Sequence, residues 1–171
     1  MKNFLLGVLS TLAVLLVAGF AFLRLGLAEV RGDVPSSSLE TYLMKGAVHA
    51  AVRRNAPDMP NPVPPTEENL IAGGRQFLGE CAGCHGTPGK QRKYPDGLNP
   101  AAPQLPIVGT EYTEAQIFWV AKHGIRRSGM FSNGLWDSDE ELRRIAAFIK
   151  HIKNLPPRVQ EELRKKPQNG D

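Results

Sequence analysis

The stretch Cys81-Ala82-Gly83-Cys84-His85 determines how the rest of this 171-residue sequence is interpreted. Its pattern, C-x-x-C-H, is the attachment signature of a c-type haem. The two thiols stand one helical turn apart, and each can form a thioether with a vinyl group of the porphyrin. The histidine that follows the second thiol can then reach the iron as its proximal ligand. The sequence therefore predicts one covalent haem held by Cys81, Cys84 and His85.

Two other kinds of site use the same cysteine spacing, and the surrounding sequence argues against both. A thioredoxin-like redox pair requires an alternating strand–helix pattern, which is absent here. A structural zinc site requires four ligands. The chain has only two cysteines, and its other histidines, His49, His123 and His151, do not stand at metal-site spacing. Two cysteines three positions apart also make no disulfide framework.

Helical patterns lie on both sides of the motif. Three segments each have an N-cap residue followed by apolar residues at helical spacing. The glycine- and proline-rich residues 86–109 are predicted to form a loop, and no segment has a strand pattern or an internal repeat. The expected helices run from Thr66 into Cys81, from Thr113 to Gly124 and from Ser138 to the pair Pro156-Pro157.

A second axial ligand of the iron has to come from further along the chain. Small helical cytochromes pair histidine with methionine, and Met130 is the one methionine between residues 66 and 156. The glycine before it, in Ser128-Gly129-Met130-Phe131, lets the backbone approach the haem closely. We therefore expect Met130 to be the second ligand. The alternatives are a packing role for Met130 and ligation by His123.

Residues 66–156, about half of the chain, resemble the class I mono-haem cytochrome c domain. Gly73 and Phe77 are similar to the glycine and the aromatic residue of that family's first helix. Ala146-Ala147-Phe148-Ile149 is similar to the small and aromatic residues of its last helix, and the resemblance implies that these two helices cross closely. It also implies an all-α fold, with three to four helices around one haem c.

The same resemblance implies a proline whose carbonyl accepts the free N–H of the haem histidine. Pro103, in Pro103-Gln104-Leu105, matches best, and Pro106 and Pro100 are the alternatives. Such a bond orients the imidazole ring and raises its basicity. The chain departs from the family at Phe131, where a proline often follows the ligand methionine, and in the loop after His85, which has fewer glycine and aromatic residues.

The N-terminus carries a membrane segment. Residues 4–23 contain no charge and stand between Lys2 and Arg24, and a helix of this length spans about 30 Å, the thickness of a hydrocarbon core. A secretory signal peptide cleaved after Ala28 is the alternative, but the apolar run exceeds the roughly 7–15 residues usual for such a peptide. We predict that residues 1–25 form a transmembrane signal anchor in contact with lipid.

The segment between the anchor and the domain has two parts. Ser37 and Glu40 form a capping-box pattern at the start of a short amphipathic helix expected over 37–54, which is a spacer lying against the domain or the membrane or, alternatively, an element that docks on a partner. Five prolines within residues 57–65 predict a stiff, extended linker. The expected divisions are the anchor at 1–25, the juxtamembrane helix and linker at 26–65, the cytochrome c domain at 66–157 and a charged, solvated tail at 158–171.

The charge of the chain indicates the kind of partner. The formal net charge is +4, a mild excess that is compatible with docking on an acidic protein surface, and no nucleic-acid motif is present. We expect redox partner proteins with an acidic docking surface, attracted by Lys122, Arg126 and Arg127 beside the haem edge. The other basic residues between the two ligands are Lys90, Arg92 and Lys93.

The chain has no recognisable general base, nucleophile or catalytic triad, so we do not expect an enzyme. Two protein ligands on the iron predict electron transfer. Because bacteria form the thioethers outside the cytoplasm, we expect a single-pass protein of the cell membrane with its haem domain in the periplasm. A haem-bearing subunit of a multi-subunit membrane oxidoreductase is the first alternative. A haem sensor or peroxidase with an open iron site is the second.

Overall fold

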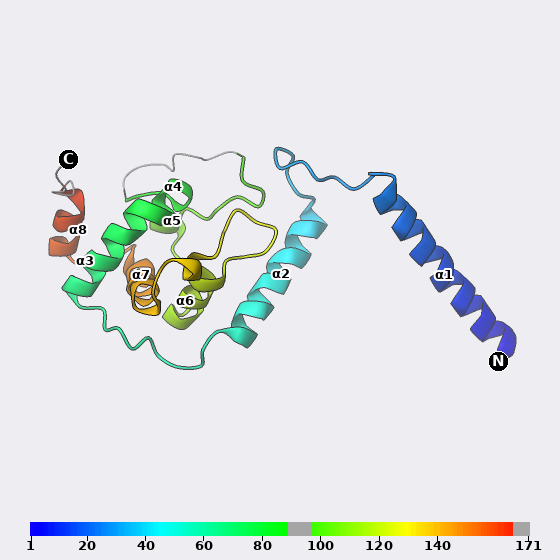
Figure 1. Ribbon diagram of the computed structural model, residues 1–171, viewed down its shortest axis with the longest axis horizontal. Coiled ribbons are helices and arrows are strands. Elements are labelled where there is room, and N and C mark those ends of the chain that lie inside the picture. The colour runs from blue at the N-terminus through cyan, green and yellow to red at the C-terminus, as the bar shows by residue number, and fades with distance from the viewer. Residues whose placement is uncertain (89–96, 166–171) are drawn as a thin grey trace. The chain divides into compact units, whose positions relative to one another are not determined.

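The computed structural model of the chain describes residues 1–88 and 97–165 (Figure 1). The chain divides into two compact units, Met1–Gly32 and Asp33–Asp171. Throughout the described residues the regular elements are helices and none is a strand, which confirms the predicted all-α fold.

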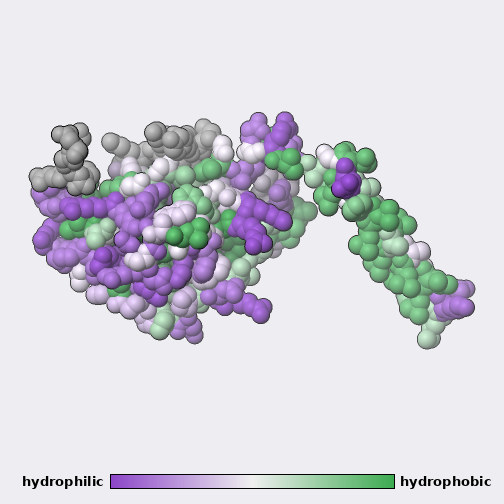
Figure 2. All heavy atoms as spheres, viewed as in Figure 1, coloured by the Kyte–Doolittle hydropathy of each residue, from purple (hydrophilic) through white to green (hydrophobic). Residues whose placement is uncertain are grey.

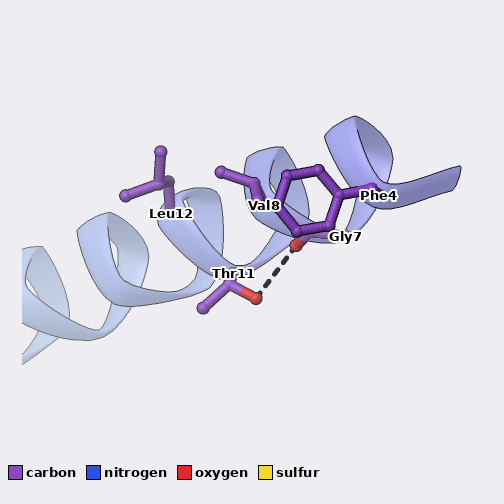
Figure 3. A pocket seen from close by; sticks show the side chains of 5 residues that line it. All are labelled: Phe4, Gly7, Val8, Thr11 and Leu12. Atoms are coloured by element: carbon purple, nitrogen blue, oxygen red, sulfur yellow. Dashed lines mark hydrogen bonds between the residues drawn. The ribbon is translucent and has the colours of Figure 1, made fainter. Parts of the chain in front are cut away.

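The first unit contains the helix α1, Lys2–Arg24, which is long and apolar enough to cross a membrane and has no buried residue. Its surface is apolar almost throughout, whereas the visible face of the second unit is mostly hydrophilic (Figure 2). In a shallow apolar groove along α1, the Thr11 hydroxyl donates to the Gly7 carbonyl oxygen at 2.9 Å (Figure 3). The helix therefore satisfies its own polar groups, as a membrane span must. A signal sequence has the same length and composition.

Three helices form the centre of the second unit: α3, Glu67–Gln76; α6, Glu114–His123; and α7, Asp139–His151. Each begins where the sequence predicts it. The hydroxyls of Thr66, Thr113 and Ser138 accept from backbone amides of the first turn, and the last two make full capping boxes. The apolar faces of α3, α6 and α7 meet in one core.

The helices α3 and α7 cross at the residues for which the sequence predicts close approach. A Cβ atom added to Gly73 would collide with the carbonyl oxygen of Arg144 on α7, so only glycine fits there. One turn later, the rings of Phe77 and Phe148 lie 5.3 Å apart, and neither side chain is exposed to solvent. The crossing fixes the direction in which α3 runs into the haem motif.

The chain between α3 and α7 contains short helices that the sequence pattern did not predict. Helix α3 continues into a wider π-helical turn, Phe77–Cys81, which is followed by the short helix α4, Ala82–His85. A short α5, Leu105–Val108, and a 3₁₀ turn, Asn133–Leu135, lie within expected loops. These elements are too short to show a period of 3.6 in the sequence.

The segment predicted to be a spacer and linker packs against the domain. Helix α2, Ser38–Asn55, lies along α6, and Val52 is 1% exposed (Figure 1). The C-terminal part of the chain also departs from the expected solvated tail. Helix α8, Pro157–Arg164, packs against α3, and its Val159 is 0% exposed. Most residues of α8 are charged and face solvent, so its single apolar stripe is hard to recognise in the sequence.

Candidate haem site

Cys81, Cys84 and His85 lie on consecutive helical turns directly after helix α3. The π-helical turn Phe77–Cys81 is held by the buried ring of Phe77 and passes directly into α4. Cys81 and Cys84 are unpaired with each other and half-buried. Because they stand one helical turn apart on the same side, the pair is suited to two thioether bonds with one haem c. His85 follows at the last residue of α4.

The imidazole of His85 is oriented by the loop after the motif. Its Nδ1 atom lies 3.0 Å from the carbonyl oxygen of Pro103. A carbonyl can only accept a hydrogen bond, so Nδ1 carries the proton and Nε2 keeps its lone pair for a metal. Of the three prolines that the sequence left open, this geometry favours Pro103 over Pro100 and Pro106.

Met130 contacts His85, and a tight loop after α6 presents it. The amide of Ile125 donates to the Met130 carbonyl at 2.8 Å. The Ser128 hydroxyl donates to the Ile125 carbonyl at 2.7 Å and accepts from the Met130 amide at 3.1 Å. These bonds fix the backbone of Met130 without using its thioether sulfur. Gly124 opens the loop at φ 66°, where a side chain would collide with the Met130 carbonyl oxygen.

Ser128 is a functional residue that sequence reasoning missed. Its hydroxyl spans the loop that carries Met130, a role that serine often takes in turns. The signal was present as the pair Ser128-Gly129 directly before the predicted ligand. A second missed residue is Asn133, whose buried amide donates to the Ala121 carbonyl at 3.1 Å and ties the 3₁₀ turn to α6.

The electrostatics of Cys81 argue against a dithiol redox site. Burial raises the pKa of the Cys81 thiol to about 12, and the negative charges of Glu80 and Asp137 act in the same direction. A redox-active pair of the thioredoxin kind needs a thiol whose pKa is lowered. In the described part of the chain, moreover, no three His, Cys, Asp or Glu side chains converge as a metal site of their own.

His123 and the basic residues lie beside the methionine loop. The His123 ring is exposed at the last residue of α6 and stacks on Trp119 with centroids 5.1 Å apart. Lys122 is paired with Asp139, with Nζ and Oδ1 2.6 Å apart, so its charge is partly neutralised. Arg126 and Arg127 are exposed. The other predicted basic residues, Lys90, Arg92 and Lys93, lie outside the described residues.

The donor set fits a covalent haem c. Two half-buried thiols can hold its vinyl groups, an imidazole with its Nδ1 proton engaged can bind the iron, and a methionine stands in contact with that imidazole. This arrangement could hold one haem c, and it is consistent with ligation of the iron by His85 and Met130.

Comparison with known proteins points the same way. Residues 68–149 match the family model described as cytochrome c oxidase, cbb3-type, subunit III. The match begins in the first turn of α3 and ends within α7, so it covers His85, Pro103 and Met130. A comparison with curated proteins finds no match, and a comparison with solved structures finds none either.

Proposed function

Since residues 68–149 form a cytochrome c domain of the cbb3 oxidase subunit III family, we propose that the chain is a membrane-anchored periplasmic protein that transfers electrons through one His/Met-ligated haem c. A cytochrome c domain implies haem-based electron transfer. The observation that carries the finer proposal is the placement of His85 between the Pro103 carbonyl and Met130.

The roles of the site residues follow from that placement. Cys81 and Cys84 would hold the haem covalently, and His85 and Met130 would be the two protein ligands of its iron. A bound haem supplies the one-electron Fe(III)/Fe(II) couple. With His85 and Met130 both bound to the iron of a haem, no position would be left for a substrate, and the chain would serve electron transfer. The soft thioether of Met130 favours the ferrous state, while the hydrogen bond to Pro103 makes His85 a stronger donor.

The proposed location rests on α1 and on the covalent attachment. The helix is long enough to span the hydrocarbon core, and none of its residues is buried within the protein. We take it as a retained anchor rather than a cleaved signal sequence because its apolar run is longer than that of most signal peptides. Cytochrome c domains are typically extracytoplasmic, and this supports a periplasmic position for the second unit.

A second candidate function is a haem-bearing subunit of a membrane oxidoreductase complex. The family description, which names an oxidase subunit, favours it. Extraction of the chain in mild detergent distinguishes the two. A free carrier elutes alone, whereas a subunit elutes with its companion chains.

The proposed partners are redox proteins with acidic docking surfaces. Arg126 and Arg127 are exposed in the loop that leads to Met130, where they can raise the rate of encounter with an acidic partner. Lys122 contributes less because Asp139 neutralises it. Electron-transfer rates that fall as ionic strength rises are the expected result, and rates independent of salt would contradict this steering.

The ligand assignment is tested by the absorption spectrum of the ferric protein. The wild type should show the weak long-wavelength band of sulfur-to-iron charge transfer, and Met130→Ala should lose it. Met59→Ala is the matched control, because Met59 is exposed and lies before the domain. A wild type without that band, whose reduced form binds carbon monoxide readily, would reject His/Met ligation and favour a sensor or peroxidase.

A further inference from the structure

Helix α2 has apolar side chains on two opposite faces, and among the residues that the structure describes only one of these faces has a partner. On one face Val52 is buried. On the same face, the centre of the His49 ring lies 5.2 Å from that of Tyr112, which stands just before α6. On the other face, Leu39 and Leu43 lie one helical turn apart and are 67% and 56% exposed. Tyr42, one helical turn after Leu39, is also exposed.

The chain forms hydrogen bonds with the rest of the domain both before and after α2. These bonds hold the first face of the helix against the domain. Before α2, the Ser36 hydroxyl donates to Asn99 Oδ1 at 3.0 Å, and Asn99 Nδ2 donates to the Val34 carbonyl. After α2, Asn61 Nδ2 donates to Glu114 Oε2 at 2.7 Å and to the Arg143 carbonyl at 2.9 Å. A surface that seats the outer face of α2 would therefore orient the whole haem domain.

The position of this outer face in the chain indicates what it meets. Its large apolar residues lie in the first two turns of α2, at the end that follows α1 in the sequence. Residues 25–37, which connect α1 to α2, span at most about 45 Å when fully extended. If α1 crosses the bilayer, as the proposed function holds, the outer face of α2 is thus tethered within reach of the lipid surface at all times.

The residues beside the outer face suit the boundary between lipid and water. Tyr42 combines an apolar ring with a hydroxyl, and Arg53 and Arg54 carry positive charge on long apolar stems. Such residues beside exposed leucines are typical of helices that lie in the membrane interface and bind anionic lipid. The tether to α1 keeps the effective concentration of lipid near α2 high, which favours binding of α2 in the membrane interface. The tether does not favour docking of α2 in the groove of another protein.

We propose that Leu39, Tyr42 and Leu43 of α2 seat in the outer leaflet of the membrane and thereby hold the haem domain in one orientation on its surface. This inference rests on the proposed function only in requiring that α1 is retained as the anchor. It assigns α2 a lipid-binding role in place of the role of a passive spacer.

Spin labels on the full haem-loaded chain in vesicles of phosphatidylethanolamine and phosphatidylglycerol test the proposal. The native cysteines are occupied as thioethers, so a nitroxide reacts only with an introduced thiol. The test variant is Leu43→Cys, with Ala13→Cys in α1 as the lipid reference and Glu161→Cys in α8, whose side chain is 73% exposed, as the aqueous reference. Collisions with oxygen and with a water-soluble nickel chelate are measured on the reduced protein, because low-spin ferrous iron is diamagnetic.

The expected result is a ratio of oxygen to nickel accessibility at Leu43→Cys that is several-fold above that at Glu161→Cys and below that at Ala13→Cys. A second variant, with Leu39→Glu added, should lower the ratio at Leu43→Cys toward the aqueous reference. If Ala13→Cys is in lipid and Leu43→Cys is in water, the anchor stands and this inference fails. If Ala13→Cys is also in water, the anchor itself fails.

A protein partner on the same face would give a different result. The Leu43→Cys label would then be shielded from both reagents in native membranes that retain companion chains, and would be exposed to the nickel chelate in pure lipid vesicles. That outcome would overturn the membrane assignment in favour of a docking interface.

Discussion

Arg127 is held in a backbone conformation that glycine usually adopts. Its φ is 61°, and it is the one non-glycine residue with positive φ among those the structure describes. The left-handed region costs a residue with a Cβ atom about 1–2 kcal/mol, whereas glycine enters it freely but loses more entropy on folding. We predict that Arg127→Gly leaves the free energy of unfolding unchanged or raises it by up to about 1 kcal/mol, and that Arg127→Val lowers it by more than about 1 kcal/mol.

Urea unfolding of the haem-loaded protein, followed by its absorption spectrum, measures both effects. Arg126→Gly is the matched control, because Arg126 stands one position earlier with ordinary negative φ and should lose about 0.5–1 kcal/mol on replacement. Equal losses for Arg126→Gly and Arg127→Gly would show that the loop before Met130 stores no such strain.

Glu80 makes the stability of the domain depend on pH. Partial burial raises the pKa of the Glu80 carboxyl above 4.5, and the nearby charge of Asp137 adds to the effect. A carboxyl whose pKa is raised on folding stabilises the fold below pH 4.5, and this contribution is lost as the pH rises through the folded-state value. Glu80→Gln should therefore flatten the fall in urea midpoint between pH 4.5 and neutrality.

The change should stay below about 1 kcal/mol because Glu80 is still largely exposed to water. Glu68→Gln, on the exposed face of α3, is the matched control and should leave the pH profile unchanged. An identical profile for Glu80→Gln and the wild type would remove Glu80 as the source of the effect.

Residue identity predicted the site better than it predicted the loop around it. Cys81, Cys84 and His85 follow from one five-residue motif because thioether attachment fixes their spacing. Pro103 came from family resemblance alone, since its carbonyl reaches His85 across 18 positions of loop that no periodicity describes. The hydrogen bonds of Ser128 could not be predicted from the sequence, because a serine beside a glycine indicates a turn but not which groups the serine hydroxyl joins.

At the scale of elements, the α3–α7 crossing depends on close approach at Gly73. A Cβ atom at Gly73 would meet the Arg144 carbonyl, which is backbone and cannot rotate away, whereas one at Gly79 would meet nothing within 4 Å. We predict that Gly73→Ala lowers the free energy of unfolding by about 1–3 kcal/mol through forced separation of the helices. Gly79→Ala should be neutral or stabilise by up to about 1 kcal/mol, because alanine loses less backbone entropy.

Chemical denaturation of the two variants decides between them. Similar values for Gly73→Ala and Gly79→Ala would mean that α3 and α7 can move apart at no cost, which would contradict close packing at Gly73.

The elements that the sequence predicted well are those with a cap and a long apolar period. The starts of α3, α6 and α7 agree with their N-cap residues Thr66, Thr113 and Ser138 because capping is local. Helix α8 was missed because its buried face is little more than Val159, with Leu163 packed against Gly74. The π-helical turn was missed because Gln76 to Cys81 also fits an unbroken α-helix.

At the scale of the whole second unit, the chain before the haem motif is part of the folded body. Five prolines predict a stiff, extended segment at 57–65, but stiffness does not imply separation from the domain. The amide of Asn61 bonds to Glu114 on α6 and to the Arg143 carbonyl on α7, across 53 and 82 positions of sequence. No local pattern in the sequence could reveal such a contact, since both acceptors are distant in the chain.

Asn61→Ala should therefore loosen α2 and destabilise the unit together. Losing bonds to a carboxylate and to a half-buried carbonyl should cost about 1–3 kcal/mol in the free energy of unfolding. Amide exchange in α2 should also become faster, because the helix keeps its contact with α6 but loses its downstream tie. Asn69→Ala is the matched control, since Asn69 Nδ2 donates only to the Pro64 carbonyl five positions away. Equal exchange rates in α2 for the two variants would mean that Asn61 does not hold this helix, and the domain would then be free to turn on its tether.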